Sequence, residues 1–381
     1  MPGLNDTARA IAFTCLWGAS LAQAGEVTIP HTFSAGTPAL ASQVNANFAA
    51  VETAVDGNAA DIASLQALVS AQAATIATLQ TQLNAVMANS VLALNGALSL
   101  GTDAQGNPTA FVTGVNVQIV NGLGTTDAVN GLGNLTIGYN ETAPTPTAFC
   151  STNLYIDQAN CEFWGGIWAA NQRTGSHNLI VGTGNAYTRH GGLIAGYANS
   201  TNAAYASVSG GNYNLARGDH SAISGGYHNR TDNYSSSVSG GAENHARAEG
   251  SSISGGSFNL TSGFRASVSG GLTNTAQGAN SNVSGGELNV ASGDRASVSG
   301  GLNNTAQGLY SSVTGGDTNL ASGETSSVAG GAYNTAVGID SAVTGGYSND
   351  ALGVRSTVSG GLGRTANSGY DWVAGLLFQE N

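Results

Sequence analysis

One apolar β-branched residue returns every fifteen positions in the C-terminal half of the chain, and this period constrains the fold more than any other feature. Gly-Gly pairs, from Gly210-Gly211 to Gly360-Gly361, and a column of Asn residues, from Asn214 to Asn349, keep the same interval. A strict short repeat predicts an architecture in which each unit contacts mainly its neighbours. The apolar ladder consists of Val208, Ile223, Val238, Ile253, Val268, Val283, Val298, Val313, Val328, Val343 and Val358.

A unit of fifteen residues rich in Gly, Ser and Asn is poor helix material, but it fits one turn of a β-solenoid. Residues 207–209 read as a short strand with Val208 pointing to one face and its two serines to the other. Gly210-Gly211 turns the chain, and residues 214–216 form a second strand. Coils stacked about 4.8 Å apart place Val on Val and Asn on Asn. The predicted fold class is mainly β, a parallel β-solenoid of 15-residue repeats at residues 176–369.

The S-V-(S/A)-G-G-x-x-N-x-A-x-G unit resembles the repeats of YadA-like trimeric autotransporter adhesin heads, over roughly half of the chain. The resemblance implies a left-handed parallel β-roll, three copies packed around one axis, and attachment to surfaces. Small side chains beside the apolar ladder also suit close packing of rolls, since one coil alone buries little apolar surface. We therefore expect a homotrimer. The chain departs from that family, in which the head precedes the coil and a membrane-anchor β-barrel follows.

Ahead of the repeats, apolar residues spaced alternately by four and three predict a coiled coil at residues 41–94, trimeric by the resemblance. Asn58 and Gln72 occupy d positions, where polar residues specify register and strand number. The alternative is an amphipathic helix in a globular core. The a and d positions are Val44, Phe48, Val51, Val55, Asn58, Ile62, Leu65, Val69, Gln72, Ile76, Leu79, Leu83 and Val86.

The first 24 residues read as a signal peptide: Arg9, an apolar run at residues 10–17, and an A-x-A cleavage site at residues 22–24. A linker at residues 25–40 follows, and no later stretch reads as apolar enough to span a membrane as a helix. We expect an exported protein, secreted or on a bacterial outer surface, with no integral membrane anchor in this chain. A buried or disordered N-terminus is the alternative.

Residues 95–142 carry β-rich runs, such as residues 111–113 and 115–120, and are interpreted as an adaptor. Residues 135–138 and 179–182 read as early, irregular coils on either side of an insertion at residues 143–175. Aromatic bulk at residues 370–381 is interpreted as a C-terminal cap.

The insertion holds Cys150 and Cys161, while Cys15 lies in the expected signal peptide and would leave with it. Two cysteines in an exported chain predict a disulfide. A metal site needs more ligands than these two cysteines supply, and the six His residues are scattered.

The charge pattern and the motif search exclude several classes of function. The net charge is -12, all ten basic residues are Arg, and no basic cluster indicates a nucleic-acid partner. His220, His228 and His245 fall in variable positions of the repeat, and no catalytic triad, paired carboxylates or phosphate loop emerges. We expect neither enzyme activity nor a cofactor.

The leading hypothesis is an exported adhesin-like fibre whose head presents a repetitive face to cells, matrix or another surface. A purely structural, phage-like fibre and an ice-binding solenoid are the alternatives. The two residues after each Gly-Gly pair vary widely, so we expect them to face outward and to carry the contacts. The candidate outer surface comprises Tyr213, Tyr227, His228, Phe258, Tyr333 and Tyr347.

Overall fold

The computed structural model describes residues 26–88, 94, 96–144, 148–152 and 157–375. The chain divides into two compact units, residues 1–117 and 118–381. The predicted signal peptide lies outside the described residues.

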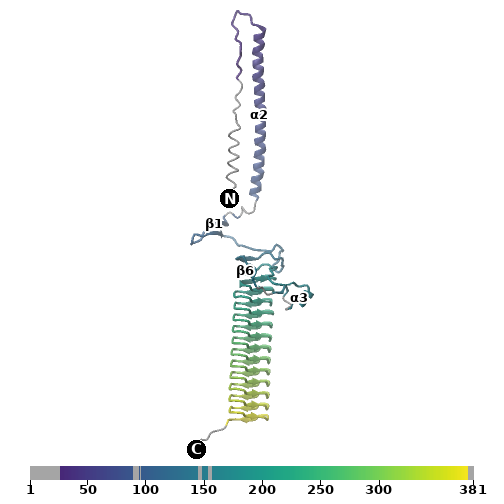
Figure 1. Ribbon diagram of the computed structural model, residues 1–381, viewed down its shortest axis with the longest axis vertical. Helices are drawn as coiled ribbons and strands as arrows, with labels where there is room; N and C mark the ends of the chain where they lie inside the picture. Colours follow the sequence, from purple (N-terminus) through teal and green to yellow (C-terminus); the bar gives the residue numbers. More distant parts are fainter. Residues whose placement is uncertain (1–25, 89–93, 95, 145–147, 153–156, 376–381) are drawn as a thin grey trace. The chain divides into compact units, whose positions relative to one another are not determined.

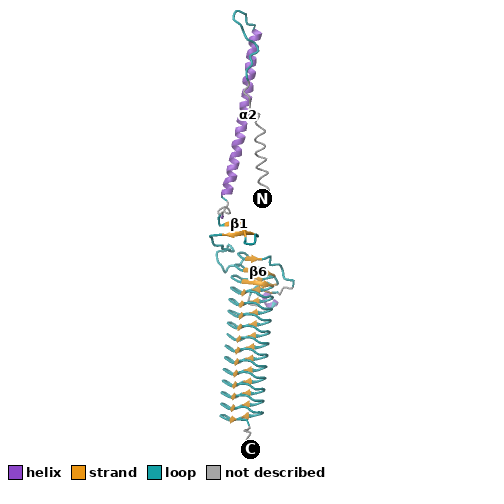
Figure 2. Ribbon diagram, turned by 90° about the vertical axis from the view of Figure 1, so that its left-hand side faces the viewer, coloured by secondary structure: helices purple, strands orange, loops and turns teal. Residues whose placement is uncertain are grey.

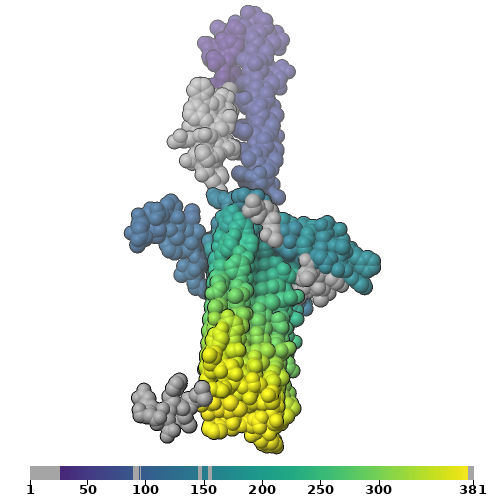
Figure 3. Space-filling model, turned by 60° about the horizontal axis from the view of Figure 1, so that its bottom comes forward, coloured from purple at the N-terminus to yellow at the C-terminus, as the bar shows by residue number. Residues whose placement is uncertain are grey.

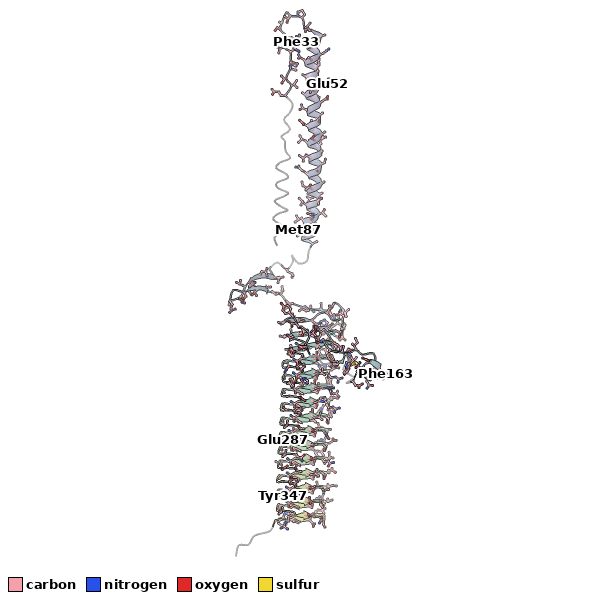
Figure 4. All side chains as sticks on the ribbon, in the orientation of Figure 1. Phe33, Glu52, Met87, Phe163, Glu287 and Tyr347 are labelled. Carbon is pink, nitrogen blue, oxygen red and sulfur yellow. A yellow bond between two sulfur atoms is a disulfide. The ribbon has the colours of Figure 1, made fainter. Side chains whose placement is uncertain are left out.

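The first unit is dominated by one long helix, α2 (Ala41–Met87), which begins where the coiled coil was predicted to begin. None of its residues is buried, and the heptad residues Phe48 and Val69 are 69% and 62% exposed. In a single chain, therefore, α2 is not the amphipathic helix of a globular core. An extended segment runs beside its N-terminal part, where Asn47 donates to the backbone oxygen of His31 (2.6 Å) and accepts from its N–H (2.9 Å). Figure 4 labels Phe33 on this segment, beside the helix.

By length and composition alone, α2 qualifies as a membrane-spanning helix, with an 18-residue window of mean hydropathy 1.4. The expectation that no such stretch follows the signal peptide is therefore wrong. The reason is compositional: many Ala residues lie between the apolar heptad positions, and charged residues are rare in this helix.

Part of the adaptor folds as a hairpin. Strands β1 (Leu98–Thr102) and β2 (Pro108–Val112) pair antiparallel, with Leu98 opposite Val112. Residues 115–120, expected as a β-rich run, form no strand.

The second unit is a parallel β-solenoid (Figures 1 and 2). Its first sheet, here called the valine sheet, has 15 strands in chain order. They are β3 (Leu135–Ile137), β6 (Leu179–Thr183), β8 (Leu193–Tyr197), β10 (Ser207–Val208), β12 (Ala222–Ile223), β14 (Ser237–Val238), β16 (Ser252–Ile253), β18 (Ser267–Val268), β20 (Asn282–Val283), β22 (Ser297–Val298), β24 (Ser312–Val313), β26 (Ser327–Val328), β28 (Ala342–Val343), β30 (Thr357–Val358) and β32 (Trp372–Val373).

The second sheet, here called the alanine sheet, has 13 strands, also in chain order. They are β7 (Ala186–Tyr187), β9 (Ser200–Thr201), β11 (Leu215–Ala216), β13 (Arg230–Thr231), β15 (His245–Ala246), β17 (Leu260–Thr261), β19 (Thr275–Ala276), β21 (Val290–Ala291), β23 (Thr305–Ala306), β25 (Leu320–Ala321), β27 (Thr335–Ala336), β29 (Asp350–Ala351) and β31 (Thr365–Ala366).

The register confirms the predicted 15-residue period over most of the stack. From β10 onward each coil pairs with the next at an interval of 15, as in Val208 with Ile223. The first coils are shorter, because Ile180 pairs with Ile194 and Ile194 with Val208, an interval of 14. β3 pairs with β6 across the insertion, and β32 adds a strand within the segment interpreted as a cap.

The core of the solenoid is a thin double ladder. The predicted Val and Ile residues are buried against the Ala or Thr column of the alanine sheet, as Val268 is against Ala276. The Asn column is buried as well: the side chain of Asn274 donates to the carbonyls of Gly270 and Gly286 and accepts from the N–H of Asn289, each at 2.9 Å. Backbone groups at the turns are thus paired by an Asn side chain in each coil from Asn214 to Asn349.

The two glycines of each pair have different roles. A Cβ on Gly211 would lie 2.1 Å from the carbonyl oxygen of Gly226 in the next coil, and its φ is +76°. A Cβ on Gly270, the first member of its pair, meets no atom within 4 Å. The close approach of coils therefore requires the second glycine, while the first has a left-handed backbone only in the last two pairs, at Gly345 and Gly360.

Candidate binding site

Each coil presents two outward corners, and both are built on a left-handed residue that is rarely Gly. At the first corner Tyr213 has φ +58°, and at the second His220 has φ +58°. The N–H of Tyr213 donates backward to the carbonyl of Tyr197, whereas that of Leu215 donates forward to Asn229. This reversal at the corner places variable side chains outside the ladders. The first corner consists of the two residues after each Gly-Gly pair, and the second consists of the columns that start at Ala204 and Tyr205.

The structure places all six residues of the predicted outer surface at the first corner. Tyr227 and Tyr347 stand in a ladder of isolated bridges between coils, and the other four stand in the left-handed column beside it. Figure 4 shows Glu287 and Tyr347, both in this ladder, on one edge of the solenoid. All six are exposed except Tyr213, which is half-buried.

These residues form two separate groups. Tyr213, Tyr227 and His228 are in ring contact, with centroids of Tyr213 and His228 5.1 Å apart and of Tyr227 and His228 4.3 Å apart. Tyr333 and Tyr347 form a second pair at 5.3 Å, several coils away. Phe258 joins neither group. Aromatic pairs at such distances stabilise each other modestly and hold their rings in place.

The predicted disulfide is present: Cys150 and Cys161 are bonded, with Cα atoms 5.7 Å apart. It links β4 (Phe149–Cys150) to α3 (Gln158–Phe163), and β4 pairs antiparallel with β5 (Trp168–Ala169). The side chain of Asn202 donates to the carbonyl of Cys150 (3.0 Å) and so fastens the insertion to an early coil. Figure 4 shows Phe163 where the insertion projects from the solenoid.

A cavity of about 180 Å³ forms where this insertion meets the first aromatic group. Its wall includes Phe149 from the insertion, Tyr213 and His228 from the first corner, and Leu215 and Arg230 from the alanine sheet. Phe149 is only 3% exposed, so it forms a fixed wall. The insertion thus distinguishes these coils from all later ones, which present the corner alone.

A compact charge cluster lies beside the cavity on the alanine sheet. Asp232 accepts from Arg230 Nε (2.6 Å) and from His245 Nε2 (2.6 Å), and Arg217 lies 3.7 Å away. Burial acts to raise the pKa of Asp232, but the hydrogen bond from His245 and the charge of Arg230 outweigh it and lower that pKa to about 2. Burial, followed by repulsion from Arg230, lowers the pKa of Arg217 to about 10, which leaves it charged at neutral pH. Two guanidinium groups against one carboxylate give a local positive charge.

The sequence analysis missed Phe149, Arg230 and the whole second corner. Along that corner Tyr205 stacks on His220 (5.0 Å), Arg265 lies over Phe264 (4.7 Å), and Arg355 lies over Tyr370 (5.6 Å). The fifteen-residue spacing of Tyr205, His220 and Ser235 was a usable signal for this corner. Phe149 has no periodic relation to the coils, so the repeat alone gives no sign of it.

Two other kinds of site were sought among the described residues, a metal site and a second cavity. No group of three or more His, Cys, Asp or Glu in this part of the chain could hold a metal ion. A larger cavity of about 450 Å³ adjoins His177, but that ring accepts from Asn121 N–H (3.2 Å) and contacts the carbonyl of Thr126 (3.0 Å), so both its nitrogens are engaged.

In comparisons with known proteins, no protein-family model and no curated protein matches the chain.

Proposed function

We propose that the chain is an exported, adhesin-like fibre that attaches to a cell, matrix or other surface through the first corner of its solenoid. One observation carries this proposal: variable aromatic side chains stand at the surface of a frame whose core columns hardly vary. Aromatic groups held on rigid corners give contact area at low entropic cost. Figure 3 shows the coils as one continuous column.

A homotrimer of left-handed rolls is part of the proposal. The heptad residues of α2 are exposed in one chain, and residues such as Leu83 (57%) and Ile76 (56%) need partners in water. Three heads in one particle also convert weak corner contacts into avidity. The polar d residues Asn58 and Gln72 would then set the register of the coil.

The experiment compares beads coated with the wild-type chain and with a variant in which Tyr213, Tyr227, Tyr333 and Tyr347 are all Ser. We expect the variant to keep its far-ultraviolet spectrum and sedimentation coefficient while attachment to cells or matrix falls several-fold. In a matched control, Tyr205, Tyr234 and Tyr310 of the second corner are replaced by Ser. Attachment that survives the first variant, or that falls equally in both, contradicts the assignment to the first corner.

An ice-binding solenoid is the second candidate, and one observation favours it. The outward residues of the valine sheet form two columns of small side chains, most of them Ser or Thr, and the second column is exposed in a single chain. That column contains Ser209, Ser224, Ser239, Ser254, Ser269, Ser284, Ser299, Thr314, Ala329, Thr344 and Ser359.

Packing of rolls in the proposed trimer and ice binding would both use the outer face of the valine sheet, so one substitution separates them. If the rolls pack through the valine sheet, Ser269→Cys should crosslink copies on mild oxidation. If that face is free, the thiol should instead react readily with a bulky maleimide, and the wild type should inhibit ice recrystallisation.

A further inference from the structure

We propose that the cavity between the insertion and the first aromatic group binds one carboxylate-bearing sugar residue, a hexuronate or a sugar of similar chemistry. This inference rests on the proposed attachment function and names the ligand class of its N-terminal part. The site is defined by Phe149, Tyr213, His228, Leu215 and Arg230.

The cavity's size and walls fit a small ring. Its volume of about 180 Å³ is below the roughly 300 to 1,000 Å³ of pockets that take drug-sized molecules. The rings of Tyr213 and His228 are tilted by 40° to each other and form one wall. Aromatic faces carry partial negative charge, which attracts the polarised C–H groups on the flat face of a pyranose. A single six-membered ring is therefore a better fit than a peptide or an extended apolar ligand.

Arg230 supplies the charge preference. Its described hydrogen bond uses Nε, which donates to Asp232, and a guanidinium carries four further N–H groups on its two terminal nitrogens. A guanidinium fork pairs with a carboxylate through two parallel hydrogen bonds. Arg230 is partly buried, with 31% of its side chain exposed, so such a pair would be shielded in part from water.

The neighbours of Arg230 reinforce this preference. Asp232 would repel an anion if it acted alone, but it lies between Arg230, Arg217 and His245. Asp232 also restrains the guanidinium group of Arg230, because its carboxylate accepts a 2.6 Å hydrogen bond from Nε. In a chain of net charge -12 without Lys, Arg230 in the cavity wall, with the buried Arg217 3.7 Å from the same Asp232, is a local exception. The cluster therefore orients the cation and leaves a net positive charge at the cavity.

The test titrates methyl β-D-glucuronide into the full chain, with methyl β-D-glucoside as the uncharged control of the same ring. From the ligand efficiency of small molecules, we expect a Kd on the order of 1 mM for the glucuronide. The glucoside should bind on the order of tenfold more weakly, because it lacks the charge-assisted hydrogen bonds. Saturation-transfer nuclear magnetic resonance measures both ligands and maps which sugar protons touch the protein.

Two variants at the site and one control locate the binding. Arg230→Gln should weaken glucuronide binding on the order of tenfold and leave glucoside binding unchanged. Tyr213→Leu should weaken both sugars alike. Arg265→Gln, at an exposed Arg beside Phe264 on the second corner, should change neither. Melting temperatures close to that of the wild type must accompany these results, and Arg230→Lys provides a milder variant should Arg230→Gln unfold.

Three outcomes overturn the proposal: no glucuronide binding by the wild type at 20-fold the expected Kd, equal binding of both sugars, or unchanged binding in Arg230→Gln. The bead assay separates this failure from failure of the attachment function. Attachment that depends on the first-corner tyrosines but is insensitive to saturating glucuronide keeps the adhesin and removes the sugar site. Glucuronide binding by a chain that attaches to nothing keeps the site and removes the adhesin.

Discussion

The solenoid and the helix α2 differ in where their apolar side chains find partners. In the solenoid Val268 and Val298 are at most 1% exposed, and each contacts its equivalents in the coils before and after it. In α2 no residue is buried. A parallel stack finds its neighbours along its own chain, whereas a lone helix with one apolar stripe does not. The solenoid thus pairs its apolar side chains within one chain, whereas the apolar stripe of α2 stays exposed in that chain.

The largest effect should come from a charge in the core ladder. Val268→Asp places a carboxylate between Ile253 and Val283, where no cation is near, and should cost about 4 kcal/mol or more of unfolding free energy. Urea unfolding followed by circular dichroism measures the change. Thr273→Asp, at the exposed first corner of the same coil, is the control and should be nearly neutral. Equal stability of the two variants would show that the ladder is not a core.

A charge on the helix tests the other half of the comparison. Ile62 is 55% exposed in one chain, so Ile62→Asp should change the stability of the chain little if α2 is monomeric. If three copies bury this a position, the substitution should cost about 3 kcal/mol or more per chain and dissociate the trimer. Sedimentation velocity at micromolar concentration distinguishes the two. Ser64→Asp, at an outer heptad position, serves as the control. The trimer is contradicted if the wild type sediments as a monomer and both variants sediment in the same way.

The Asn column is expected to contribute almost as much as an apolar residue. Asn274→Ala removes two donors and one acceptor and leaves the carbonyls of Gly270 and Gly286 and the N–H of Asn289 without that partner. We expect a loss of about 2 to 3 kcal/mol, measured by urea unfolding. Asn303→Ala, at the exposed left-handed corner of a nearby coil, should cost about 1 kcal/mol or less, mainly because Ala tolerates this backbone less well than Asn. If Asn274→Ala leaves the free energy of unfolding unchanged, the hydrogen bonds of the Asn column do not stabilise the solenoid.

Acid should weaken the solenoid through Asp232. Its pKa is lowered to about 2 in the folded chain, below its ordinary value of 3.8, so its stabilising effect is complete above pH 3.8 and is lost as pH falls toward 2. The shift corresponds to about 2 kcal/mol. Thermal melts between pH 5 and pH 2 should therefore fall more steeply for the wild type than for Asp232→Asn. Parallel pH profiles would disprove the coupling.

The smallest effect concerns a polar group that the stack does not need. Ser311 Oγ is buried and has no hydrogen-bond partner among the described residues, while Ala266 and Ala296 occupy the same column in other coils. Ser311→Ala should be neutral or stabilise the chain by up to about 1 kcal/mol. Differential scanning calorimetry resolves such a shift. A clear loss of stability would reveal a partner for the hydroxyl, such as a buried water.

Sequence periodicity predicted the parts of the fold that repeat. Val208, Asn214 and Gly211 recur because each must fit against its own copy in the next coil, so a fifteen-residue interval carries the register directly. The start of α2 followed from the heptad in the same way. Contacts between a repeat and a unique segment leave no such record, and Phe149 against the coils of Tyr213 and His228 is the main example. The cluster of Arg230, Asp232 and His245 could be predicted in part. Arg230 and His245 are fifteen residues apart and therefore share a column once the register is known.

The constant register from β10 onward also links the length of the solenoid to the number of its coils. Because each coil pairs only with the coils before and after it, gain or loss of one fifteen-residue unit in the gene changes the reach of the head by one strand spacing, about 4.8 Å, and leaves every other coil intact. The insertion and its cavity are tied to the first coils through Asn202, so such length changes move the distal end away from them without altering them. The number of coils can therefore change the length of the solenoid without changing the cavity.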